Sequence, residues 1–110
     1  MQAIHGFFIE NTTLTSLSLN NCNINSEGGY DLGEALKNSR CLEEFLASGN
    51  KLRYEGVRTI ADTIEKTGSL KTIDLSQNSI EDKGGLLLAD ALDKSRSIQK
   101  VYLRENNFHD

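Results

Sequence analysis

Leu70-Lys-Thr-Ile-Asp-Leu-Ser-Gln-Asn-Ser-Ile80 is the stretch of this 110-residue chain that decides its fold. The pattern within it, L-x-x-L-x-L-x-x-N/C-x-L, occurs four times at a constant 28-residue spacing. Its first column holds Leu14, Leu42, Leu70 and Ile98, and its asparagine column holds Cys22, Asn50, Asn78 and Asn106. A fixed period of this length is typical of stacked repeats, each too small to bury its apolar residues alone.

Each copy of the pattern starts with one periodicity and continues with another. In the third copy, residues 72–75 alternate polar and apolar side chains, which predicts a strand with one buried face. The segment 88–92, Leu-Ala-Asp-Ala-Leu, has the i, i+3, i+4 spacing that gives a helix one apolar face. Ser26 and Asp82 stand where the N-caps of two such helices are expected.

Stacked units of this kind predict an α/β solenoid, a curved horseshoe segment with parallel strands on its concave side and helices on its convex side. The chain, 1–110, is expected to be a single domain. Its expected parts are a partial repeat, three full repeats and a truncated repeat: 1–13, 14–41, 42–69, 70–97 and 98–110. Neither end shows a polar capping repeat, so we expect a fragment of a longer solenoid. The alternative is that the ends pack against another chain, which includes end-to-end self-association.

The repeats resemble the ribonuclease-inhibitor-like class of leucine-rich repeats. The resemblance rests on the 28-residue length, on the pattern quoted above, and on a glycine such as Gly84 that opens the following helix. It covers residues 14–108. Similar repeats occur in ribonuclease inhibitor, Ran GTPase-activating proteins, NOD-like receptors and tropomodulin-type actin regulators. The resemblance implies an intracellular scaffold that binds another protein.

Composition argues against several other classes of function. The net charge of −4 disfavours nucleic acid as a partner, and the longest apolar run is too short to span a membrane. Cys22 and Cys41 fall at opposite ends of a strand segment, too far apart for a disulfide, which favours a reducing compartment and a cytoplasmic protein. His5 and His109 lie near opposite termini and build no metal site. We therefore expect no enzymatic activity and no cofactor.

The candidate partner-binding residues are those that point away from the buried face of the expected strands. Tyr102 and Arg104 are the strongest candidates because both residue types are favoured at the centres of interfaces. The full set expected on the concave face is Glu44, Leu46, Asp74, Lys100, Tyr102 and Arg104. On the convex side, Leu86 and Leu87 exceed what the core of a repeat needs and form a second candidate contact.

Two alternatives to a simple binding module stay open at this stage. One is a GTPase-activating protein of the Ran regulator type, with Arg53 as the arginine placed in a strand-to-helix loop. The other is a structural segment of a NOD-like receptor or an actin regulator. The identity of the protein partner does not follow from the repeat pattern.

Overall fold

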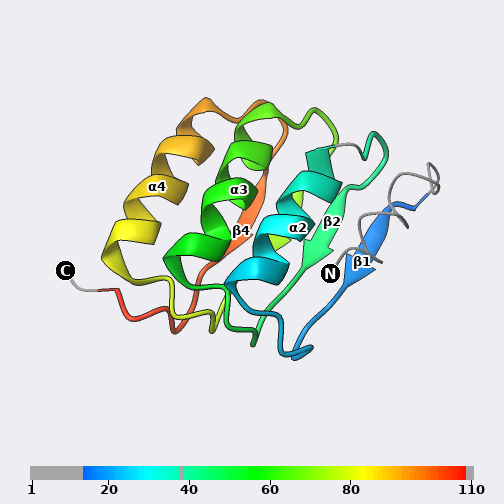
Figure 1. Ribbon diagram of the computed structural model, residues 1–110. Coiled ribbons are helices and arrows are strands. Elements are labelled where there is room, and N and C mark those ends of the chain that lie inside the picture. The colour runs from blue at the N-terminus through cyan, green and yellow to red at the C-terminus, as the bar shows by residue number, and fades with distance from the viewer. Residues whose placement is uncertain (1–13, 38, 109–110) are drawn as a thin grey trace.

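The structure is a computed structural model that describes residues 14–37 and 39–108. Strands and helices alternate along these residues: β1 (Ser16–Ser18), α2 (Ser26–Lys37), β2 (Glu44–Leu46), α3 (Arg53–Lys66), β3 (Thr72–Asp74), α4 (Glu81–Lys94) and β4 (Lys100–Tyr102). The strands form one parallel sheet in the order β1-β2-β3-β4. The three helices lie side by side over one face of that sheet (Figure 1). The predicted α/β fold with parallel strands is confirmed, while the curvature of a horseshoe stays a prediction.

The register of the sheet follows the period of the sequence. Phe45 pairs with Ile73, its equivalent in the next repeat, and Ile73 pairs in the same way with Val101. Phe45 and Ile73 are fully buried, together with helix residues such as Leu32 and Ile60. One apolar layer between the sheet and the helices therefore forms the core, and the other face of the strands is left open.

Asn78 shows what the asparagine column does. It is 0% exposed, and its side chain bonds only to backbone. The Nδ2 amide donates to the carbonyls of Leu75 and Ser76 in its own repeat, at 3.1 and 3.0 Å, and to Ala47 of the preceding repeat at 2.9 Å. The N–H of Leu52 donates to Asn78 Oδ1 at 3.3 Å. The predicted structural role of this column, to satisfy backbone groups where each strand turns away, is confirmed for its asparagines. Cys22, the first member of the column, is exposed instead, and its Sγ reaches only the carbonyl of Asn20, at 3.5 Å.

The expected N-cap at Ser26 is wrong. Asn25 caps α2 instead, because the N–H of Gly28 donates to Asn25 Oδ1 at 2.9 Å. The Ser26 hydroxyl donates to the carbonyl of Leu52, at 2.9 Å, in the next repeat. Ser26 thus links two repeats, while its sequence neighbour Asn25 caps the N-terminus of α2.

The expected N-cap at Asp82 is also wrong. Ile80 precedes α4 without a side-chain cap, and Asp82 lies inside the first turn. The N–H groups of Ile80 and Glu81 donate instead to the side chain and main chain of Asn106, at 3.3 and 2.7 Å. The following repeat therefore accepts hydrogen bonds from backbone N–H groups at the start of α4. In an isolated helix, a local capping side chain accepts such bonds.

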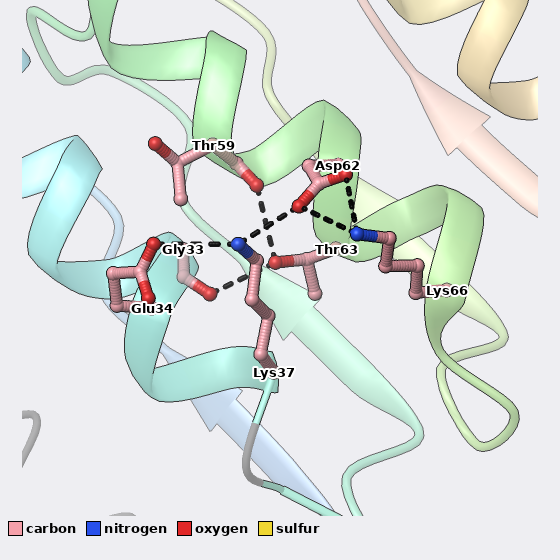
Figure 2. Close-up of polar contacts among 7 residues, drawn as sticks. All are labelled: Gly33, Glu34, Lys37, Thr59, Asp62, Thr63 and Lys66. Atoms are coloured by element: carbon pink, nitrogen blue, oxygen red, sulfur yellow. Dashed lines mark hydrogen bonds and ion pairs between the residues drawn. The ribbon is translucent and has the colours of Figure 1, made fainter.

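Helices α2 and α3 approach closely because α2 presents glycines to its neighbour. A Cβ atom on Gly33 would lie 2.8 Å from the carbonyl carbon of Thr59, and one on Gly29 would lie 2.9 Å from the Cα of Gly56. Because the two helices lie this close, the buried Thr63 hydroxyl can donate a hydrogen bond to the Gly33 carbonyl, at 2.8 Å (Figure 2). Backbone of one helix thus packs directly on backbone of the next.

Candidate partner-binding surface

The strand face, as we call the side of the sheet away from the helices, brings the candidate residues together in rows. Leu46 on β2, Asp74 on β3 and Tyr102 on β4 are register partners and form one row. Glu44 and Lys100 belong to the neighbouring row, in which Thr72 lies between them. Parallel strands about 4.8 Å apart keep such side chains adjacent. The structure therefore assembles the candidate set on one surface, and its role in binding stays a prediction.

The carboxylates of this surface are engaged within the chain. Glu44 Oε1 accepts a hydrogen bond from the Ser16 hydroxyl at 2.7 Å, across the β1–β2 pair. Asp74 Oδ1 accepts from the N–H of Ser76 at 2.9 Å, so it stabilises the turn after its own strand. Both acids therefore have structural partners in addition to any contact they make with another protein.

The cations in and directly after β4 are placed differently. Lys100 and Arg104 are exposed, and their charged groups have no hydrogen-bond or ion-pair partner among the described residues. Tyr102 is the last residue of β4, lies between them in sequence and is 43% exposed. Tyrosine and arginine are among the residue types that dominate protein interfaces.

Two other positions on the strand face are less open than their outward placement suggests. Leu46 is half-buried, so only part of its side chain is available to a partner. Ser76 is 7% exposed, and its Oγ accepts a hydrogen bond from the N–H of Arg104 at 3.0 Å. Sequence alternation places such residues on a face and does not show that a neighbouring strand covers them.

Of the expected apolar pair on the helix side, one residue is strongly exposed. Leu86 is 74% exposed, whereas Leu87 is half-buried and packs against the core. Tyr30 on α2 is 55% exposed and was not singled out by the repeat pattern. The exposed apolar side chains on the helices therefore lie on different elements, and Leu86 keeps its place as a secondary candidate.

A groove of about 360 Å³ between α3 and α4 was also missed by sequence reasoning. Tyr54 lies at one end of it, and the Lys83 ammonium stands 4.4 Å from the centre of the Tyr54 ring. Its lining mixes charged and apolar side chains from both helices: Tyr54, Arg58, Ala61, Asp62, Glu65, Leu87, Asp90 and Ala91. Only the spacing between two helices in three dimensions defines this groove, so no local motif indicates it.

An ion pair between Lys37 and Asp62 connects α2 to α3 on the helix side of the sheet, and Lys66 of α3 joins it (Figure 2). Lys37 Nζ lies 2.8 Å from Asp62 Oδ2, and Lys66 Nζ lies 3.2 Å from Asp62 Oδ1. Lys37 also reaches Glu34 in its own helix at 3.3 Å. The hydrogen bond from Lys37 lowers the pKa of Asp62, and the same bond raises the pKa of Lys37.

Replacing Asp62 with asparagine is expected to cost up to about 1 kcal/mol of stability at neutral pH, since both partners are partly solvated. Because folding lowers the pKa of Asp62, its contribution is present above its ordinary pKa and is lost as pH falls through the lowered value. Chemical denaturation of both proteins from neutral to acidic pH checks this. Asp90→Asn, whose partner Lys94 is on the same helix, is the matched control and should change stability less.

An Asp62→Asn variant that keeps the full pH dependence of the parent in acid would contradict the assignment. High salt should also shrink the difference between the two proteins, because exposed ion pairs are screened.

The described residues show no arrangement typical of metal chemistry. In 14–37 and 39–108, no group of three or more His, Cys, Asp or Glu side chains could hold a metal ion. None of the helices in this part of the chain is long and apolar enough to cross a bilayer. Cys22 and Cys41 are free and exposed, and Arg53 is an exposed residue at the start of α3. His5 and His109 lie outside the described residues.

Comparison with known proteins agrees with the fold. The chain superimposes on the tropomodulin C-terminal domain of Caenorhabditis elegans with a TM-score of 0.84 at 21% identity, covering 96% of this chain and 64% of that one. For a structure titled "Leiomodin-1 Actin-Binding Site 2 (ABS2)", the TM-score is 0.81 at 18% identity, with 97% and 61% covered. The chain thus spans less than two thirds of either structure, and no curated protein matches its sequence.

The sequence pattern itself has a direct match. A family model described as "Leucine Rich repeat" matches residues 10–33 and 69–89. The second match begins one residue before Leu70 and includes the stretch that ends at Ile80. The two matched segments are thus similar to leucine-rich repeats, and the strands of the parallel sheet recur with the same period as the sequence.

Proposed function

We propose that this chain is a non-catalytic protein-interaction module that binds actin through its strand face. The observation that carries the use of this face is the exposed Tyr102 at the end of β4, with Lys100 at the start of the strand and Arg104 in the turn that follows it. The choice of actin is supported by the fold, which resembles a leiomodin-1 domain whose title names it an actin-binding site. Among the alternatives drawn from the sequence, this favours the actin-regulator type over the Ran type.

We further propose that the repeats are of the ribonuclease-inhibitor-like class and that the protein works in the cytoplasm without a cofactor. The class is supported by strands that pair at equivalent positions of successive repeats and by a full helix after each of the first three strands. A reducing compartment suits Cys22 and Cys41, which are both free and exposed.

The double variant Tyr102→Ala, Arg104→Ala is expected to weaken actin binding by about tenfold or more, because truncation of an interface anchor typically costs about 2 kcal/mol or more. Cosedimentation with filamentous actin and a titration of labelled monomeric actin measure the change. Leu86→Ala, on the opposite side of the molecule, is the control and should bind like the parent. Both variants alter exposed side chains, so their melting temperatures should match that of the parent.

The outcomes separate the two parts of the proposal. Absence of actin binding by the unmodified chain would remove actin as the partner. Equal binding by the parent and the double variant would keep actin and move its site away from the strand face.

A further inference from the structure

The groove between α3 and α4 reflects a difference between successive repeats. At the junction of α2 with α3, Gly33 packs against Thr59, and the equivalent residues one repeat later are Ala61 and Leu87. Larger side chains at a helix contact hold the two axes further apart, and α3 packs less extensively against α4 than against α2. The resulting groove of about 360 Å³ lies between two neighbouring helices. A further repeat at either end of the array would leave it open.

The floor of this groove is small and apolar. Ala61 of α3 and Ala91 of α4 are both 3% exposed, and the half-buried Leu87 also lines the groove. Because the main-chain groups inside α3 and α4 bond within their own helices, the floor has none to offer an extended strand. A helix satisfies its own main chain and needs only side-chain contacts. The floor therefore suits the apolar face of another helix.

The two ends of the groove differ in charge. In the first half of α3, Arg58 is exposed, and the Lys83 ammonium lies 4.4 Å from the centre of the Tyr54 ring. Near the end of α3, the half-buried Glu65 lines the groove. Neither Arg58 nor Glu65 makes a hydrogen bond or an ion pair with any residue in 14–37 or 39–108. The groove thus has a positive end and a negative end.

The other acids of the groove are already engaged within the chain. Asp62 pairs with lysines of α2 and α3, and Asp90 pairs with a lysine of its own helix. This leaves Arg58 and Glu65 as the charged side chains of the lining that lack an opposite charge in contact. They are seven residues apart on one helix, which corresponds to about 10.5 Å along its axis.

We propose that this groove binds one amphipathic helix of a partner protein, which lies parallel to α3. The bound helix carries a carboxylate near its N-terminus, against Arg58, and a cation seven residues later, against Glu65. Apolar side chains three and four residues after the carboxylate cover Ala61 and Ala91. Helices that bind in grooves use these same positions, i, i+3, i+4 and i+7. The order of the charges also suits the dipole of the bound helix, which favours an acid at its N-terminus and a base at its C-terminus.

The probe is an alanine-based helical peptide with a glutamate, leucines three and four residues later, and an arginine seven residues after the glutamate. It is titrated into the ¹⁵N-labelled full chain, where the N–H signals of Ala61, Leu87 and Ala91 should shift. A control peptide has lysine in place of the glutamate and should bind about tenfold more weakly, because its lysine meets Arg58.

The variant Arg58→Glu reverses the charge at the positive end. It should bind the lysine peptide about as tightly as the parent binds the glutamate peptide, because both charges of that peptide then meet opposite charges. Arg58 is exposed and without a contact, so circular dichroism should show an unchanged fold. A nitroxide at the N-terminus of the glutamate peptide should broaden the Arg58 signal more than the Glu65 signal.

Equal binding of the two peptides by the parent, or unchanged groove signals with millimolar peptide, would overturn the proposal. Stronger broadening of the Glu65 signal would show that the bound helix runs the other way. If a peptide with proline at its centre binds equally well, the occupant is extended and the proposed helix is wrong. If the groove signals shift with the concentration of the chain alone, the occupant is a second copy.

The outcome is independent of actin binding. The variant Tyr102→Ala, Arg104→Ala should bind the glutamate peptide as the parent does, because its altered side chains belong to the strand face and the groove lies between the helices. Loss of peptide binding in this variant would contradict the proposed site.

Discussion

Replacing Asn78 with alanine is expected to lower the free energy of unfolding by about 3–5 kcal/mol, because each buried polar group left without a partner costs about 1–3 kcal/mol. The change removes an amide that donates to three backbone carbonyls and an oxygen that accepts from the N–H of Leu52. All of these groups lie in the core, where Asn78 is 0% exposed. Urea denaturation followed by circular dichroism measures the loss.

The chain supplies a matched control for this prediction. Cys22 occupies the asparagine column in the first copy, so Asn78→Cys tests a side chain that the pattern tolerates elsewhere. Because the thiol is a weak donor, we expect the free energy of unfolding of Asn78→Cys to lie between those of the parent and the alanine variant. If the alanine variant were as stable as the parent, water would have to replace the amide, and the backbone of the junction would not depend on it.

Replacing Gly33 with alanine is expected to destabilise the chain by about 2 kcal/mol, although alanine is the better helix former. Intrinsic propensity favours alanine by about 1 kcal/mol within a helix. Overpacking opposes it by about 3 kcal/mol, because the new Cβ would clash with Thr59 Cγ2 and lie 2.8 Å from the Thr59 carbonyl carbon. The helix can relieve this contact only by moving, since part of it is with backbone.

Gly68→Ala is the control for Gly33→Ala. A Cβ at Gly68 would have no heavy atom within 4 Å, so the change should be neutral or stabilise by up to about 1 kcal/mol through the unfolded state. Thermal denaturation of both variants should therefore give shifts of opposite sign or a shift for Gly33→Ala alone. A Gly33→Ala variant with a higher melting temperature than the parent would show that α2 and α3 can separate without cost.

The elements that sequence predicted well are those set by periodicity. Alternation around Phe45 and Ile73 requires that these residues face one side, and a constant interval between repeats brings them into register. The structural role of the buried Asn78 side chain could be predicted in the same way, because a polar residue buried among apolar ones must find hydrogen-bond partners.

The features that sequence missed depend on contacts between repeats. Ser26 looks like an N-cap by type and position, yet its hydroxyl bonds to Leu52 in the next repeat. By sequence alone, Gly33 is only a residue of low helix propensity. The structure shows that Thr59 of the next helix packs against it and leaves no room for a side chain. The strand-face candidates, such as Tyr102 and Arg104, could be assigned to a surface from alternation, whereas their partner is set by chemistry outside this chain.

The asparagine bonds described for Asn78 and Asn106 have a consequence for how the molecule comes apart. Each bond set joins one repeat to the next, so the interaction energy is held at junctions and little of it belongs to a repeat alone. Loss of one inner repeat would therefore break two junctions at once. Unfolding is expected to spread along the array from neighbour to neighbour, as in a one-dimensional cooperative chain. For the same reason, an array of this kind can lengthen or shorten by whole repeats without disturbing the bonds elsewhere in it.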